Sequence, residues 1–218
     1  TCIAPDYVMV PRERMIELAE QVLAEARRAY PSVGADYSSL ISDRAFDRMT
    51  TAIAEAEQGG AKVLRHPAPS DRSKRILPPV VVLDAPENCV LMREEIFGPV
   101  LPIVGYDTLE DALDWINTHP HPLALYIFAE DRKEQNRVLD RTQSGGVTVN
   151  GTLLHIAQEG LPFGGVGASG MGAYHGRAGF DRFTHARAVF RTGFFNAADW
   201  LAPPYGRRAK RLLRFLMR

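Results

Sequence analysis

The sequence predicts an α/β fold, with an open, mostly parallel sheet and flanking helices over residues 7–149. Short apolar runs alternate with longer amphipathic stretches along this region, which is the order of strands and helices in such folds. The run at residues 80–83 is apolar at four consecutive positions, as expected of a strand buried on both faces. At 218 residues the chain is long enough to bury a core without disulfide or metal staples.

The first strand and the first two helices are read from local signals. Residues 7–10 are rich in β-forming side chains and Pro11 follows them, so a short strand is expected there. Residues 12–29 repeat apolar side chains at helical spacing. A loop over residues 34–40 leads to Ser42, whose side chain can cap a second helix that ends at a pair of glycines.

Further strands and a capped helix are expected in the middle of the chain. The strands are predicted at residues 61–64, 80–83 and 100–104. Thr108 and Asp111 have the spacing of a capping box, which predicts that a helix begins directly after Thr108. Prolines at positions 120 and 122 end that helix.

The alternation continues to Asn150 and then stops. A strand is predicted at residues 123–128, a charged helix at residues 131–142 and a strand at residues 146–149. Residues 160–180 contain eight glycines, a composition that allows main chains to approach one another closely.

The charges balance over the whole chain, with 26 basic and 26 acidic residues. Residues 206–218 hold six cations and no acid, which leaves a net charge of −6 on the first 205 residues. The neutral total argues against a nucleic-acid partner. The tail alternates its cations with Leu212, Leu213, Phe215 and Leu216, which fits peripheral contact with a membrane surface. We favour the alternative of a short helix at a dimer interface or in solvent.

The two cysteines, Cys2 and Cys89, lack the spacing of a disulfide framework or a zinc site, so no metal is expected. No membrane span or signal peptide is recognisable, and the chain is read as cytoplasmic. Cys2 is a candidate nucleophile, because a thiolate adds readily to carbonyl carbons. The alternative is a small, buried apolar side chain.

A second candidate group stands before the Gly-Pro turn at residues 98–99. A carboxylate such as Glu95 can accept hydrogen bonds from a ribose diol, while the ring of Phe97 packs on a planar nicotinamide. The alternative is a solvated acidic turn. The sequence contains no phosphate-binding loop in a strand-turn-helix context, so most of a dinucleotide site would lie elsewhere.

Four motifs occur in the order and rough spacing found in NAD(P)-dependent aldehyde dehydrogenases, and the chain resembles this family over almost its whole length. They lie at residues 1–8, 94–99, 145–150 and 161–167. Residues 4–7 and 171–176 resemble the class-three-like branch. Within that branch the chain is similar to bacterial coniferyl aldehyde dehydrogenases, in features such as Pro203-Pro204-Tyr205.

The resemblance implies roles for individual residues. Cys2 would be the catalytic cysteine, Glu95 would hold the nicotinamide ribose and Phe97 would pack against the nicotinamide of NAD, with NADP left open. The substrate pocket would be lined by Leu153, Ile156, Ala157 and Phe163. An apolar lining suits medium-chain or aromatic aldehydes. The Cys2 thiolate would form a thiohemiacetal and then a thioester, with its backbone N–H donating to the oxyanion.

The resemblance also implies a domain organisation. Residues 1–183 would be the catalytic domain, residues 184–195 an oligomerisation strand of a homodimer and residues 196–218 a basic amphipathic tail. The family's dinucleotide-binding domain, hydrolytic glutamate and oxyanion asparagine have no counterpart in these 218 residues. The chain alone is therefore expected neither to bind NAD tightly nor to turn over aldehyde.

Two other function classes remain open at the level of sequence. A cysteine acyltransferase or thioesterase would need Cys2 within hydrogen-bond reach of a histidine such as His155 or His175. A non-catalytic oligomerisation or interaction module would use the terminal strand and the basic tail.

Overall fold

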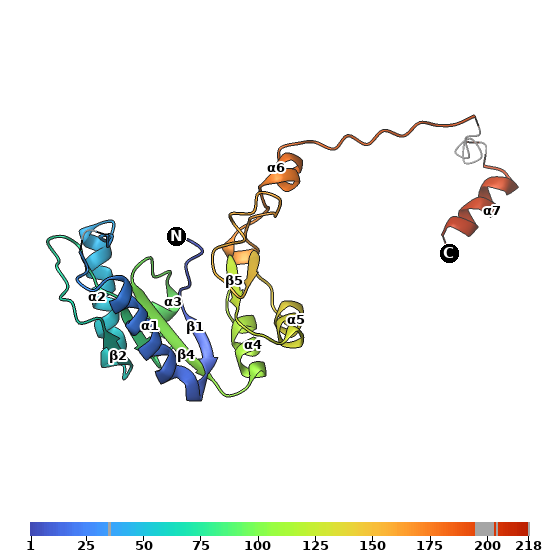
Figure 1. Ribbon diagram of the computed structural model, residues 1–218. Coiled ribbons are helices and arrows are strands. Elements are labelled where there is room, and N and C mark those ends of the chain that lie inside the picture. The colour runs from blue at the N-terminus through green and yellow to red at the C-terminus, as the bar shows by residue number, and fades with distance from the viewer. Residues whose placement is uncertain (35, 195–202, 204, 218) are drawn as a thin grey trace. The chain divides into compact units, whose positions relative to one another are not determined.

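The computed structural model describes residues 1–34, 36–194, 203 and 205–217. The chain divides into two compact units, Thr1–Arg182 and Phe183–Arg218, each of which is described by itself. The first unit contains both sheets and most of the helices, as Figure 1 shows.

A four-stranded sheet forms the centre of the first part of this unit. Its strands are β1 (Val8–Pro11), β4 (Val100–Tyr106), β3 (Val80–Leu83) and β2 (Lys62–Arg65), in that spatial order. β4 pairs in parallel with both β1 and β3, while β2 runs antiparallel to β3 at the edge. The predicted α/β class and the mostly parallel pairing are confirmed.

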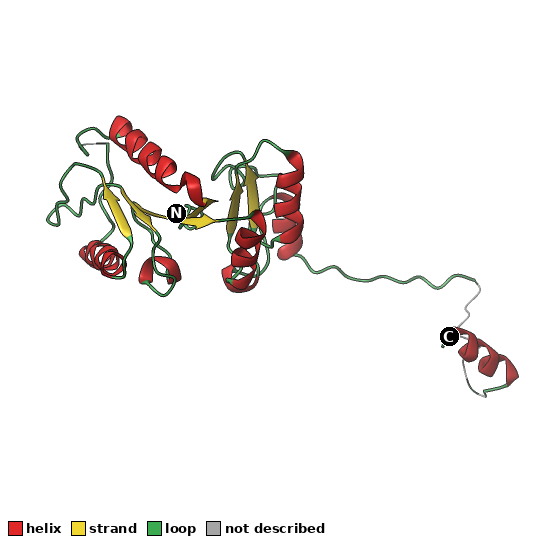
Figure 2. Ribbon diagram, turned by 90° about the horizontal axis from the view of Figure 1, so that it is seen from below, coloured by secondary structure: helices red, strands yellow, loops and turns green. Residues whose placement is uncertain are grey.

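Helices cover both faces of this sheet, as Figure 2 shows from below. The apolar stripe of α1 (Met15–Ala29) packs on the face that holds Val81 and Leu83 of β3. On the opposite face, α2 (Asp43–Gln58) packs against Val80 and Val82. Because successive side chains of a strand point to opposite faces, the apolar run of β3 serves two separate cores. Each fully buried aliphatic side chain contributes about 1.5–3 kcal/mol.

The later strands form a sheet of their own. β5 (Ala124–Ile127) and β6 (Gly146–Val149) pair in parallel, with Tyr126 opposite Thr148. The expectation of one sheet across residues 7–149 therefore needs correction, since these two strands do not extend the first sheet. The helices α4 (Leu109–Thr118) and α5 (Arg132–Arg141) are joined by Glu110, which forms ion pairs with Arg137 and Arg141.

Two of the predicted helix starts are confirmed in detail, whereas the helix predicted from residue 12 begins at Met15, after a 3-10 turn at Arg12–Arg14. Ser42 is the N-cap of α2, and its side chain accepts a hydrogen bond of 3.1 Å from the Ala45 backbone N–H. Thr108 and Asp111 form the capping box of α4. The sequence did not indicate two short helices, α3 (Val90–Arg93) and α6 (Gly176–Arg182).

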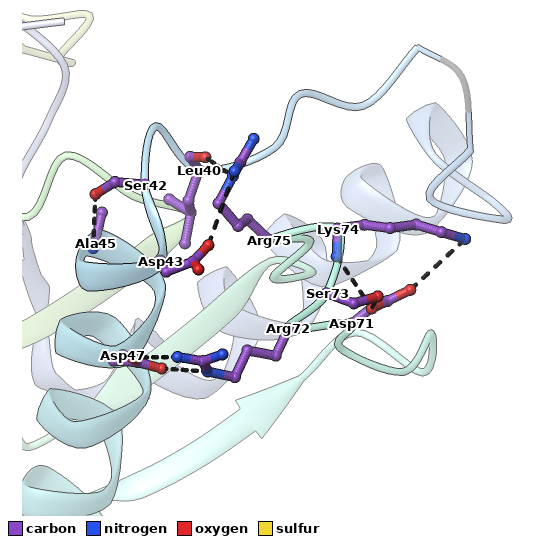
Figure 3. Close-up of polar contacts among 10 residues, drawn as sticks. All are labelled: Leu40, Ser42, Asp43, Ala45, Asp47, Asp71, Arg72, Ser73, Lys74 and Arg75. Atoms are coloured by element: carbon purple, nitrogen blue, oxygen red, sulfur yellow. Dashed lines mark hydrogen bonds and ion pairs between the residues drawn. The ribbon is translucent and has the colours of Figure 1, made fainter.

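A small hairpin fastens the start of α2 to the loop before β3 (Figure 3). Asp71 and Ile76 exchange two backbone hydrogen bonds. Arg72 lies on the Asp47 carboxylate with contacts of 2.8 and 2.7 Å. Arg75 donates to the Leu40 carbonyl at 3.1 Å, so the hairpin holds both the helix and the chain that enters it.

The glycine-rich segment brings main chains together, as its composition predicts. A Cβ atom on Gly164 would lie 2.0 Å from the Gly172 carbonyl oxygen, and one on Gly165 would lie 2.1 Å from the Ser169 oxygen. No other residue type fits at these two positions.

The second unit contains the helix α7 (Arg207–Leu216). Residues 184–194 are exposed and form no strand within the single chain, and residue 195 lies outside the described residues. The predicted oligomerisation strand would form by pairing with another subunit, so it stays a prediction. Part of the predicted tail, residues 196–202, 204 and 218, also lies outside the described residues. Among the described helices, none is long and apolar enough to cross a membrane.

Candidate active site

Residues 1–4 form the turn that carries Cys2, here called the nucleophile turn. The Ala4 backbone N–H donates to the Thr1 carbonyl at 3.0 Å, and the Ile3 N–H donates to Thr1 Oγ1 at 3.2 Å. Ile3 is only 3% exposed, whereas Cys2 is an exposed free thiol. The turn therefore anchors itself through Ile3 and presents the sulfur to solvent.

Glu95, Ile96 and Phe97, here called the cofactor segment after the role that the sequence predicts for it, are held in place by the backbone N–H and carbonyl of Ile96. The Ile96 N–H donates to Asp6 Oδ1 at 2.8 Å, and the Ile96 carbonyl accepts from Arg48 Nη2 at 2.7 Å. Ile96 is buried, while Glu95 and Phe97 on either side are exposed. Asp6 thus ties the cofactor segment to the chain that leads away from Cys2.

Phe97 adopts an unusual backbone conformation. Its φ is +45°, in the left-handed region that a residue with a Cβ atom rarely adopts. Its ring is 53% exposed although the residue is a large apolar one. The next residue, Gly98, passes so close to Met49 that a Cβ atom there would lie 2.9 Å from the sulfur. Strain of this kind, kept at an exposed aromatic residue, is typical of functional positions.

The nucleophile turn and the cofactor segment line the same hollow. Its volume is about 160 Å³, and Cys2, Glu95 and Phe97 all contribute to its wall, together with Asp6 and Ile96. The structure therefore brings Cys2 together with Glu95 and Phe97, which lie 93 and 95 positions further along the chain and which the sequence assigned to the same site.

The four residues predicted for the substrate pocket do not line this hollow. Leu153 and Ala157 are exposed and Ile156 is half-buried. Phe163 is 7% exposed and stacks on His155 and His175, at ring-centroid distances of 5.9 and 6.1 Å. Phe163 is thus packed within an aromatic cluster. The assignment of these four residues to a substrate pocket stays a prediction.

The nucleophile turn is supported by a residue that the sequence did not indicate. Tyr126 of β5 donates a hydrogen bond of 2.5 Å from its hydroxyl to the Ile3 carbonyl. Asp6 and Arg48 were also missed as supports of the cofactor segment. Asp6 stands four positions after the cysteine in the first motif, which was an available signal, whereas a tyrosine within an apolar strand carries none.

His155 does not activate Cys2. Its Nδ1 lies 2.9 Å from Thr148 Oγ1, and burial lowers its pKa, so the ring is neutral at physiological pH. Within the described part of the chain, no hydrogen bond joins Cys2 to His155, to His175 or to any other histidine. The arrangement needed by a cysteine acyltransferase or thioesterase is therefore not present among these residues.

No group of three or more His, Cys, Asp or Glu side chains that could hold a metal ion occurs among the residues the structure describes. The chemical groups in the wall of the hollow include a thiol, the carboxylates of Asp6 and Glu95 and an aromatic ring.

Comparison with known proteins shows what the chain is similar to. A family model described as the aldehyde dehydrogenase family matches residues 1–189. A "Probable coniferyl aldehyde dehydrogenase" of Caulobacter vibrioides is 44% identical over 97% of this chain and 45% of its own length. The chain thus spans about half the length of the curated relatives it matches.

Two solved structures support the same relationship. The substrate-bound AldH of Staphylococcus aureus superposes with a TM-score of 0.82 and 34% identity, covering 99% of this chain and 47% of that one. The Mycobacterium tuberculosis aldehyde dehydrogenase complexed with NAD+ has a TM-score of 0.77 and 26% identity, covering 90% of this chain and 41% of that one.

Proposed function

Because the chain belongs to the aldehyde dehydrogenase family, we propose that the protein carrying it oxidises an aromatic aldehyde of the coniferyl type to the carboxylic acid, with NAD or NADP as the hydride acceptor. The observation that supports this proposal most directly is the hollow shared by Cys2, Glu95 and Phe97. A nucleophile, a sugar-binding carboxylate and a ring for a planar base are the groups that such a reaction needs.

The side chains at the hollow fit a nicotinamide nucleoside. The Glu95 carboxylate is exposed beside the hollow and can accept two hydrogen bonds from a ribose diol. The ring of Phe97, held out by its left-handed backbone, can pack against the nicotinamide. When bound, the cofactor accepts the hydride that leaves the substrate carbon.

Cys2 begins the reaction as the nucleophile. Its thiolate attacks the carbonyl carbon, a sulfur–carbon bond forms and the carbonyl electron pair moves to the oxygen. The product is a thiohemiacetal on Cys2, whose negative oxygen needs hydrogen-bond donors. The Cys2 backbone N–H donates no hydrogen bond to any described residue, so it can supply one of them.

Loss of hydride leaves a thioester on Cys2, and attack by water releases the acid and the thiol. That last step needs a general base near the sulfur. The two carboxylates that line the hollow have other partners, because Asp6 accepts from the Ile96 N–H and Glu95 would hold the ribose. Within the described part of the chain, no carboxylate or histidine is hydrogen-bonded to Cys2. We therefore propose that the 218 residues alone do not turn over aldehyde.

The test follows NADH formation from coniferyl aldehyde, first with the protein that carries this chain and then with the 218 residues alone. We expect steady turnover in the first case and none in the second. Cys2→Ser should abolish turnover, whereas Cys89→Ser, at a buried cysteine that does not line the hollow, should leave it unchanged. Turnover that survives Cys2→Ser would refute the proposal.

The proposal also covers the substrate class and the location of the protein in the cell. An aromatic aldehyde is supported by the name of the Caulobacter relative and by the exposed apolar side chain of Leu153. Comparison of kcat/KM for coniferyl aldehyde and for acetaldehyde tests it, and a preference for acetaldehyde would exclude it.

A cytoplasmic location is supported by two cysteines that are both unpaired.

A further inference from the structure

Tyr126 connects the second sheet to the nucleophile turn. It lies in β5 opposite Thr148 of β6, and its hydroxyl donates to the Ile3 carbonyl at 2.5 Å across 123 positions of sequence. Ile3 is 3% exposed, so water competes little for this bond. The acceptor belongs to the residue directly after Cys2.

The other hydrogen bonds of the nucleophile turn are local. Ala4 bonds to the Thr1 carbonyl, and Ile3 bonds to the Thr1 side chain. Both close the turn on itself, and neither places it relative to the rest of the fold. Among the described residues, the Tyr126 hydroxyl makes the one hydrogen bond that joins the backbone of residues 1–4 to a distant element.

The same hydroxyl also meets the loop after β6. Burial raises the pKa of Tyr126, the backbone N–H of Leu153 lowers it by donating to the hydroxyl oxygen, and the charge of Cys2 raises it. Leu153 has a φ of +65°, so its backbone is held in a conformation that a leucine rarely adopts. One phenol therefore lies between the turn of the nucleophile and the loop that contains Leu153.

We propose that Tyr126 is a positioning residue of the active site, whose hydroxyl sets the turn of Cys2 against the Leu153 loop so that an electrophile resting on that loop meets the sulfur in line. This inference rests on the proposed function for its substrate. Its geometry is independent of the cofactor, because none of the contacts of Tyr126 involves the cofactor segment.

Tyr126→Phe isolates the hydroxyl. The ring keeps its place beside His155, at a centroid distance of 6.1 Å, and β5 keeps its pairing with β6. Only the donor to the Ile3 carbonyl is lost. The turn then keeps its local hydrogen bonds but samples more orientations, and misplacement of a reacting atom lowers a rate steeply.

The test compares two alkylating reagents on the full chain, iodoacetamide and its N-benzyl derivative. In both reactions the Cys2 sulfur forms a bond to carbon and iodide leaves. Only the benzyl reagent has an aromatic group that can rest on the Leu153 loop. In Tyr126→Phe we expect its rate to fall by roughly tenfold, while the iodoacetamide rate changes by less than about twofold. Mass spectrometry confirms that buried Cys89 is unmodified.

Tyr106→Phe is the matched control. Tyr106 lies in β4, is partly buried and makes no side-chain hydrogen bond to a described residue, so removal of its hydroxyl should leave both rates unchanged. Amide hydrogen exchange supplies a local readout: Tyr126→Phe should speed exchange at Ala4 but not within α1. The proposal would be overturned if Tyr126→Phe left both alkylation rates unchanged or lowered both by the same factor.

The unmutated chain offers a second measurement in case Tyr126→Phe does not fold. Ionisation of Tyr126 removes its O–H donor, and its pKa lies above the ordinary value for tyrosine. The ratio of the two alkylation rates cancels the ionisation of the thiol itself, so it should fall only as Tyr126 ionises. If the ratio of the two rates stays constant through the pH range in which Tyr126 ionises, the proposal is overturned. Because neither assay contains cofactor, both outcomes are independent of NADH formation.

Discussion

Phe97 combines a strained backbone with an exposed ring, and the two can be separated by mutation. Phe97→Gly relieves the positive φ, but it also gives the unfolded chain more freedom, so the free energy of unfolding should change by no more than about 1 kcal/mol. Both Phe97→Gly and Phe97→Leu remove the ring and should raise the KM for NAD about tenfold, which corresponds to about 1.4 kcal/mol of lost ring contact. Urea unfolding and NADH kinetics measure the two effects. A normal KM in both variants would show that the ring does not contact the cofactor.

The Asp6 carboxylate accepts a hydrogen bond from the backbone N–H of buried Ile96, and this single contact can be tested by mutation. Asp6→Ala leaves that donor without an acceptor, which should cost about 1–3 kcal/mol in the free energy of unfolding. Asp6→Asn keeps an oxygen in the same place and should retain most of the stability. Chemical denaturation of the two variants checks this, and an equal loss in both would mean that the charge matters more than the hydrogen bond.

At the scale of one element, Ser42 decides where α2 begins. Ser42→Ala removes the acceptor for the Ala45 N–H and should lower the free energy of unfolding by about 1 kcal/mol. Ser42→Asp keeps an acceptor and should restore it. Ser39→Ala, at an exposed serine without a cap role, is the control for a change of composition alone. Thermal unfolding in which Ser42→Ala and Ser39→Ala behave alike would contradict the assignment of the cap.

The hairpin of Figure 3 predicts a dependence on pH. The hydrogen bond from Arg72 lowers the pKa of the Asp47 carboxyl. A depressed pKa in the folded state stabilises the fold above the unfolded pKa, near 4, and this stabilisation is lost as the pH falls through the folded value. Unfolding by urea between pH 7 and pH 2 should therefore show a shallower loss of stability in Arg72→Gln than in the unmutated chain. Arg44→Gln, at an arginine with no ion pair to a described residue, should follow the unmutated chain.

Elements whose signals are local could be predicted from the sequence. The caps at Ser42 and Thr108 and the two-faced strand β3 depend on residues within a few positions, and the structure confirms each of them. The short helices α3 and α6 were missed because their four and seven residues are too few to show a period. The division into two sheets was missed because strand pairing is decided by contacts between distant segments.

At the scale of the whole molecule, the candidate site shows the same limit of prediction from sequence. Motifs identified Cys2, Glu95 and Phe97, and the structure places them around one hollow. The contacts that hold them there link residues 90 and 123 positions apart, Ile96 to Asp6 and Tyr126 to Ile3. No local pattern reports such a contact, so these supports became visible only in three dimensions.

The organisation into two units predicts the effect of truncation. Both core clusters lie within residues 1–182, so a chain that ends at residue 183 should keep its unfolding midpoint within about 2 °C. If residues 184–195 pair with another subunit, as the sequence predicts, the truncated chain should be a monomer where the longer one is a dimer. Light scattering after size-exclusion chromatography measures this. A dimer that persists after truncation would place the subunit contact elsewhere.

The central position of β4 has a consequence for the order in which the molecule assembles during synthesis. Among the described strands β1 pairs with β4 alone, Val8 with Ile103, so this pairing cannot form until about 95 more residues have left the ribosome. At 5–20 residues per second this takes roughly 5–20 s. Tyr126 is made later still, 123 positions after Ile3, so the nascent chain carries a thiol whose turn lacks its hydrogen bond to β5 until that strand has emerged.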